Sequence, residues 1–508
     1  MKKIFNYSML PFLLLFITSC EKGLADLNIN RTSPTAIDPV FQLNNAIVNT
    51  SFPGASLIYE IGIVQQVISP NSGVLTGANF NQDNRDNTQA LWQGYYRNVI
   101  RNTRDIINRT KDLPDRINLL NMARILQAYA FMVLTDTYGS IPYTEGGVGY
   151  INQTFLPVYD EQQAIYPKII QELTEASAAL NAGAKIETGD VLFGGTVAQW
   201  KKLGYSLMLR AGMRLSKVDA AKAQTTVQAA FAGGVILVNA DNALMRHTSD
   251  YLNPIGNTLN STEAANFYLT EPFVNYLKNT NDPRLSSIAI RYIGAKSGPD
   301  QVPAVGTSDP ARMIGMPMGK DNTGAIAAAA SLGLSSFYEF SQVDRRRLVK
   351  PSAPFFFVTA AQTQLLLAEA VQRNWITSGT AKGYYDAAVK AHMEQMATYD
   401  AAAAVPAASI QPYLDANPFN AATALQQINT QYWIASFLNG PEAFANFRRT
   451  GFPVLTPNPF PGKSITGDFI RRLTYPSSEI SVNSTNVQAA ITKQGADNLD
   501  TRVWWDKP

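Results

Sequence analysis

Helical periodicity constrains the fold of this chain more than any other feature of its sequence. Over residues 88–108 the apolar side chains recur at i, i+3, i+4, i+7, i+8, i+14 and i+15, one face of a helix: Trp92, Tyr95, Tyr96, Val99, Ile100, Ile106 and Ile107. The next segment, 117–143, is apolar nearly all round, which predicts a buried helix that stops at Gly139 and Pro142. Together the two segments predict a helical hairpin.

Two further hairpins follow from the same pattern. Segments 160–180 and 197–216 form the second, and Pro167 should either kink its first helix or mark the true start of that helix. Segments 359–374 and 381–396 form the third. A fourth candidate covers 423–451, without an evident partner. The sequence therefore predicts an all-α fold.

The spacing of these pairs separates the chain from a regular repeat array. A helix–turn–helix of this size resembles the tetratricopeptide unit, but here long segments rich in Gly, Pro, Asn and Ser interrupt the pairs. Loops beyond about 15 residues inside a compact domain are usually functional or disordered. A ligand should therefore be sought in the interruptions, which cover 71–87, 140–158, 239–262, 293–335 and 451–468.

The start of the chain predicts export and a lipid anchor. Lys2 and Lys3 precede an apolar run over 10–17, which is typical of a secretory signal peptide. The run ends at Ile-Thr-Ser-Cys, and Cys20 is the only cysteine. This order resembles a bacterial lipobox, so Cys20 would become the lipidated first residue; the alternative is a core thiol.

The predicted organisation follows from that cut site. No later segment offers the roughly 20 apolar residues that span a membrane. We expect a signal peptide over 1–19, a lipidated N-terminus and tether over 20–40, and a single helical domain over 41–508 with the long loop insertions.

The charge balance argues against a nucleic-acid partner. Removal of residues 1–19 leaves 40 basic and 39 acidic side chains, whereas a phosphate backbone requires a clustered basic surface. The triplet Arg345, Arg346 and Arg347 is a short local exception, and a solvated or salt-bridged turn explains it.

Several segments, in this order, resemble the SusD/RagB family of outer-membrane lipoproteins from Bacteroidetes. They include LWQGYYRNVIRN, ILQAYAFMVLTDTYGSIPY, VAQWKKLGYSLMLRAGMRLS, QYWIASFLNGPEAFANFRRTG, RRLTYPSSE and the closing WWDKP. The resemblance implies about four tetratricopeptide-like helix pairs packed with a variable, loop-rich half. It also implies a surface protein that covers a SusC-like TonB-dependent transporter and delivers glycans or other nutrients to it. Ligand-binding residues vary within the family, so none is carried over by position.

Motifs for catalysis or metal binding are absent or weak. The chain has two histidines, His247 and His392, no HExxH or Cys-His cluster, and no G-x-S-x-G. The paired carboxylates of a glycan hydrolase remain an alternative, because two residues that pair in the fold need not be close in the sequence. We therefore predict no enzyme, metal or cofactor. The alternatives are a tetratricopeptide-like adaptor for peptides or proteins, which the long loops disfavour, and a glycan hydrolase.

Two loops carry the mixture that sugar binding requires, aromatic rings beside planar hydrogen-bonding groups. The first offers Asn79, Phe80, Asn81, Asp83 and Arg85, and the second offers Tyr251, Asn253, Asn257 and Tyr268. A weaker third group, which could instead be a packing patch, contains Arg312, Met313, Met316 and Met318, flanked by Phe337 and Tyr338. The competing interpretation is that these aromatic rings cover the helical scaffold. By contrast, the helical stripes place Trp92, Tyr95, Tyr96 and Trp200 in the core.

Overall fold

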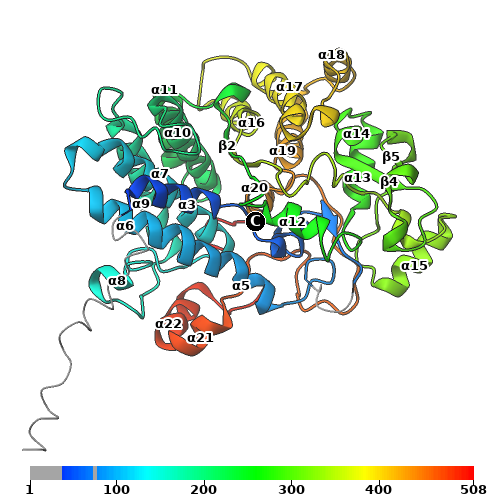
Figure 1. Ribbon diagram of the computed structural model, residues 1–508, viewed down its shortest axis with the longest axis horizontal. Helices are drawn as coiled ribbons and strands as arrows, with labels where there is room; N and C mark the ends of the chain where they lie inside the picture. The colour runs from blue at the N-terminus through cyan, green and yellow to red at the C-terminus, as the bar shows by residue number, and fades with distance from the viewer. Residues whose placement is uncertain (1–36, 72–76) are drawn as a thin grey trace, which may run out of the picture.

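The computed structural model describes residues 37–71 and 77–508 (Figure 1). The predicted signal peptide, Cys20 and most of the predicted tether lie outside the described residues. The described chain is mainly helical, as the periodicity predicted.

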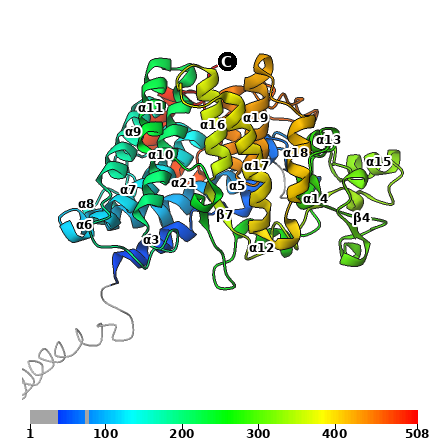
Figure 2. The ribbon, with the colours of Figure 1, turned by 90° about the horizontal axis from the view of Figure 1, so that it is seen from above.

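A first row of helices forms one side of the molecule (Figures 1 and 2). Within this row α6 packs on α7, α7 on α9, α9 on α10 and α10 on α11, so neighbours in sequence are neighbours in space. Its elements are α3 (Pro39–Val48), α5 (Arg85–Gly94), the π-helical turn η2 (Tyr95–Ile100), α6 (Arg101–Thr110), α7 (Ile117–Tyr138), α8 (Gly149–Asn152), α9 (Gln162–Ala179), α10 (Val197–Arg214) and α11 (Ala220–Gly233). The short helix α4 (Glu60–Ile63) packs instead on α20 (Gly440–Thr450).

A second row continues the first through a contact between α10 and α16. Here α16 packs on both α17 and α19, and α19 packs on α20. The elements are α16 (Ala360–Gln372), α17 (Ala381–Tyr399), α18 (Ala407–Ala416), α19 (Ala424–Ala435) and α20 (Gly440–Thr450).

The three predicted hairpins are confirmed, with two refinements. Helix α9 begins at Gln162, so Pro167 lies inside the helix and does not mark its start. The fourth candidate, 423–451, contains both members of its own pair, α19 and α20, which the turn at Ser436–Asn439 separates. Both helices are buried on most faces, polar side chains included.

The loop-rich half lies beyond the second row and below it (Figure 1). Short strands form three small antiparallel sheets, with the orders β1–β3, β2–β7 and β5–β4–β6. The strands are β1 (Val67–Ile68), β2 (Ala243–Met245), β3 (Tyr268–Leu269), β4 (Ala289–Tyr292), β5 (Gly306–Thr307), β6 (Gln342–Val343) and β7 (Phe355–Val358). The helices of this half are α12 (Pro254–Asn260), α13 (Glu271–Asn279), α14 (Arg284–Ile288) and α15 (Asn322–Ser331). The last two helices, α21 (Ser477–Val482) and α22 (Ser484–Gln494), lie instead below the first row, beside α5 (Figure 1).

Helix α7 is the central helix of the core. Residues Pro114–Tyr138 are long and apolar enough to span a membrane, which corrects the expectation that no such segment exists; among the described residues this is one helix. However, 83% of its most apolar window is buried inside the protein, as in a soluble core helix. The predicted core residues Trp92, Tyr95 and Trp200 are also buried, and Tyr96 is half-buried against Trp92.

Buried ion pairs connect the helices of the core. Glu369 on α16 accepts hydrogen bonds from both terminal nitrogens of Arg449 on α20, at 2.7 and 2.8 Å. Arg373 and Asn429 donate to the same carboxylate, at 2.9 and 3.2 Å. The Arg449 and Arg373 guanidinium groups and the Asn429 amide therefore surround the fully buried Glu369 carboxylate.

The arginine triplet is a salt-bridged turn, as predicted. Arg347 donates to Asp344 at 2.6 Å, and the Arg345 guanidinium lies over the Tyr292 ring. Arg346 is exposed.

Candidate functional site

The first predicted loop is part of the core. Phe80 is 2% exposed and stacks on Phe460, with ring centroids 4.3 Å apart. Asn79 donates to the carbonyl oxygens of Ser69 and Lys320, both at 2.9 Å, and accepts from the Gly319 N–H at 2.8 Å. The expectation that Phe80 presents an exposed ring is therefore wrong, because the loop at 456–464 covers it.

The other polar residues of this loop join neighbouring segments to one another. The Asn81 carbonyl accepts from the Ser464 N–H at 2.9 Å, and Asp83 accepts from Thr474 at 2.8 Å. Arg85 donates to Asp497 at 2.6 Å. Asn458 donates in return to the carbonyls of residues 78 and 79. We call this set the interlocked loops: residues 77–85, 319–321 and 456–464.

The second predicted loop is divided between core and surface. Tyr268 is buried in strand β3, where its hydroxyl donates to the Ala265 carbonyl at 2.6 Å, so the expected exposed ring is wrong here too. Asn253 caps α12 by accepting from the Gly256 N–H, and its amide donates to Ala353. Asn257 is exposed on α12. Tyr251 alone among the predicted aromatic residues is well exposed, at 59%.

The weaker third group is a packing patch. Met313, Met316 and Met318 are buried, and Phe337 stacks on Tyr338 with centroids 4.3 Å apart. Arg312 is exposed beside them.

Tyr251 lies at a hollow of about 520 Å³ between the first row of helices and the loop that carries Tyr251. The loop that carries Tyr251 joins β2 to α12 and extends away from the helices in Figure 2. The volume of the hollow is in the range of small-ligand sites. The lining residues come from the end of α3 and the turn after it, from α5 and η2, and from the Tyr251 loop: Val48, Asn49, Ser51, Pro53, Gly54, Ala90, Leu91, Gly94, Tyr95, Asn98, Tyr251, Leu252 and Pro254.

The chemistry of the hollow is polar but uncharged. None of the described lining residues is an Asp, Glu, Lys, Arg or His. Asn49 uses its amide hydrogens on Asn45, and within the described chain its side-chain oxygen has no donor. The side chain of Asn98 makes no hydrogen bond to any described residue. An exposed ring beside amide and hydroxyl groups can hold a sugar by stacking and hydrogen bonding.

Sequence reasoning found Tyr251 but missed Asn49, Ser51 and Asn98. Asn98 lies within a helical segment whose periodicity indicates only which face is apolar. A signal for the other two was present, since Asn49-Thr50-Ser51-Phe52-Pro53-Gly54 is a cluster of turn formers directly after a helix.

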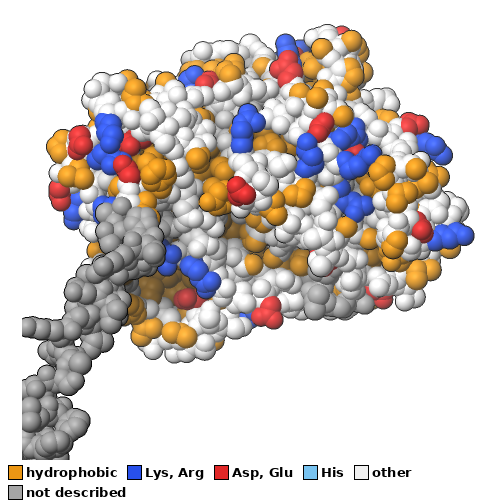
Figure 3. Space-filling view, in the orientation of Figure 1, with side chains coloured by type: hydrophobic (Ala, Val, Ile, Leu, Met, Phe, Trp, Pro, Cys, Tyr) orange, Lys and Arg blue, Asp and Glu red, His pale blue; other side chains and the backbone are white. Residues whose placement is uncertain are grey.

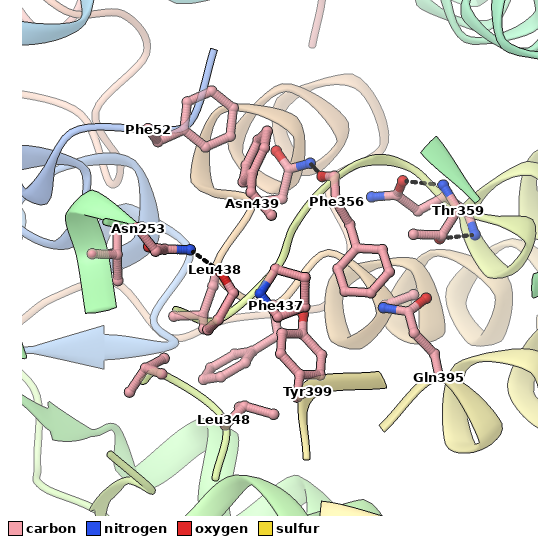
Figure 4. Close-up of a pocket in the computed structure, with 17 residues that line it drawn as sticks. Phe52, Asn253, Leu348, Phe356, Thr359, Gln395, Tyr399, Phe437, Leu438 and Asn439 are labelled. Carbon is pink, nitrogen blue, oxygen red and sulfur yellow. Dashed lines mark hydrogen bonds between the residues drawn. The ribbon is translucent and has the colours of Figure 1, made fainter. Parts of the chain in front are cut away.

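A second cavity nearby is too small for a sugar. It has about 30 Å³ of space, and the rings of Phe52, Phe356, Phe437 and Tyr399 enclose it (Figure 4). Two side-chain oxygens at its wall, Asn439 Oδ1 and Gln395 Oε1, have no hydrogen-bond partner among the described residues. A space of this size with two acceptors fits one ordered water, so we assign the cavity to the core.

Within residues 37–71 and 77–508, no group of three or more His, Cys, Asp or Glu side chains is placed to hold a metal ion.

Comparisons with known proteins identify the family and the fold of the chain. A family model described as "starch-binding associating with outer membrane", SusD-like, matches residues 30–476. The chain belongs to the SusD-like family. Its members are surface glycan-binding proteins without catalytic activity, associated with the outer membrane. No curated protein matches the chain.

Solved structures of SusD-like proteins cover nearly the whole chain. A chitin-binding protein is 30% identical over 93% of this chain and 100% of its own, with a TM-score of 0.82. A chitin-binding SusD homologue from Flavobacterium johnsoniae is 25% identical, covering 92% and 98%, with a TM-score of 0.75. A SusD homologue from Bacteroides vulgatus is 22% identical, covering 92% and 97%, with a TM-score of 0.77, and shares the fold.

Proposed function

We propose that this protein captures a glycan in the hollow beside Tyr251 and delivers it to a SusC-like TonB-dependent transporter. The observation that carries the proposal is the exposed Tyr251 ring at an uncharged hollow of ligand size, in a chain of the SusD-like family. Two similar structures are of chitin-binding proteins, so a chitin oligosaccharide is the first ligand to test.

Replacing Tyr251 by alanine is expected to weaken chitohexaose binding by about fivefold or more, because a stacking ring contributes on the order of 1 kcal/mol. The melting temperature should change little, since the ring is mostly exposed. Isothermal titration calorimetry measures the affinity. Tyr251→Phe is the matched control and should retain most of it. Unchanged affinity in the alanine variant would show that the ring is not a platform.

The anchor is the second part of the proposal, and it rests on the lipobox-like residues before Cys20. Labelled palmitate should enter the wild-type protein in cells, and it should not enter Cys20→Ala, because the thiol is the attachment point. Equal labelling of the two proteins would contradict the anchor. Protease treatment of intact cells then tests whether the protein faces outward.

An apolar surface supports docking to a partner. Asn483 and Asn486, after α21, donate to the carbonyls of Pro157 and Leu156, so α21 lies against the loop after α8. Hydrophobic side chains gather over α21 and α22 in the lower left of Figure 3. Such contiguous exposure is typical of interaction sites. We call these residues the α8–α21 patch: Phe155, Leu156, Val158, Ile480 and Val482.

Charged substitutions in the α8–α21 patch should disrupt the complex with a co-expressed SusC-like transporter. We expect Phe155→Asp combined with Val482→Asp to reduce co-purification in mild detergent at least tenfold, because each would bury a charge at the interface. Val454→Asp is the control, since Val454 is 73% exposed and outside the patch. Co-purification of the double variant at the wild-type level would exclude the patch as the docking surface.

A further inference from the structure

A buried histidine lies behind the hollow and contacts two of its segments. His247 follows strand β2 and is almost fully buried. Its Nδ1 lies 2.8 Å from the Tyr251 carbonyl oxygen, and its Nε2 lies 2.8 Å from Ser51 Oγ. The ring therefore joins the Tyr251 loop to the turn after α3, and both segments line the hollow.

The first of these contacts fixes the position of the ring hydrogen. A carbonyl oxygen can only accept a hydrogen bond, so Nδ1 must carry the hydrogen that it donates to Tyr251. Burial lowers the pKa of His247, and no ion pair joins its ring to a described residue. A neutral ring has a single N–H, so Nε2 holds a lone pair.

The second contact then fixes the hydroxyl of Ser51. With a lone pair on Nε2, Ser51 must be the donor, and its one hydrogen points away from the hollow toward His247. No described residue donates to Ser51 Oγ, so its remaining lone pairs are available to a ligand. Asn49, also at the wall, has a side-chain oxygen without a described donor.

We infer that His247 holds Ser51 as a hydrogen-bond acceptor at the wall of the hollow, so that the hollow selects neutral glycans that donate through hydroxyl or amide N–H groups. This inference rests on the proposed function. An anionic sugar, such as a uronic acid, would place a carboxylate beside the acceptor oxygens of Ser51 and Asn49, the side-chain donors of Asn98 and Tyr251 are neutral, and no described lining residue supplies a cation. Desolvating an unpaired carboxylate is strongly unfavourable. His247 acts here as a positioning residue.

The tautomer can be measured without any ligand. The chain has two histidines, so protein labelled with ¹⁵N-histidine gives two pairs of ring-nitrogen signals, and His247→Gln identifies the pair that belongs to His247. At pH 7 we expect Nδ1 to have the chemical shift of a protonated nitrogen and Nε2 that of an unprotonated one. A hydrogen on Nε2, or a charged ring, would overturn the inference whatever the protein binds.

Binding tests the choice of ligand. Calorimetry should show that chitohexaose binds the wild-type protein and that hexagalacturonate binds at least tenfold more weakly. Ser51→Ala should weaken chitohexaose binding about fivefold, the effect of one hydrogen bond, while Ser249→Ala, an exposed neighbour of Tyr251, should not. Equal affinity for hexagalacturonate would overturn the selectivity. If neither glycan binds although the tautomer is as expected, the proposed function fails and the assignment of Ser51 stands.

Discussion

Replacing Glu369 by alanine should destabilise the protein by about 3–5 kcal/mol, because it leaves the buried Arg449 guanidinium without its counter-charge. The neighbouring guanidinium groups hold the pKa of Glu369 well below its usual range, at about 2. A depressed carboxyl pKa contributes stability above the unfolded value of 4.5, and that stability is lost as the pH falls from 4.5 toward 2. Urea unfolding at pH 7 measures the loss.

The control for this variant is an exposed pair on α17. Glu394 lies 3.9 Å from Lys390, and both side chains are about half exposed. Glu394→Ala should change the free energy of unfolding by less than about 0.5 kcal/mol, because exposed pairs are weak. If Glu369→Ala and Glu394→Ala lower the free energy of unfolding by similar amounts, the buried pair contributes no more to stability than the exposed pair.

Glu60 should make the protein less stable as the pH rises, the opposite direction to Glu369. It is buried in α4, and no ion pair joins its carboxylate to a described residue. Burial raises its pKa from 4.5 to about 7. The folded state therefore binds a proton that the unfolded state releases, and the free energy of unfolding falls by about 3 kcal/mol between pH 4.5 and 7.

The variant Glu60→Gln isolates this effect, since glutamine keeps the shape without the charge. We expect its midpoint of urea unfolding to exceed that of the wild type at pH 8 and to approach it at pH 5. Glu394→Gln should follow the wild-type profile at both values. Parallel profiles for wild type and Glu60→Gln would contradict the raised pKa.

The helical rows could be predicted from the sequence because each helix has a local signal. Periodicity, Gly139 and the turn formers between 377 and 379 were sufficient to place three hairpins. The turn between α19 and α20 also has a local signal, the turn formers Asn439, Gly440 and Pro441, which periodicity alone does not detect. Buried pairs such as Glu369 with Arg449, 80 residues apart, leave no local signal.

The candidate site could be predicted only in part, because exposure depends on contacts between distant segments. Phe80 and Tyr251 lie in loops of similar composition, yet Phe460 covers the first ring and nothing described covers the second. Ser51 and His247 are 196 residues apart, so their pairing could not be inferred from spacing.

The interlocked loops have a consequence for redesign of the protein. Because Asn79 and Asn458 satisfy backbone groups of other segments, transplanting any one of the three loops from a relative would leave buried carbonyl and N–H groups unpaired. They would have to be exchanged as a set. The loop with Tyr251 does not depend on them, so its ring could be varied by itself, and a library of binders with altered preference would best begin there.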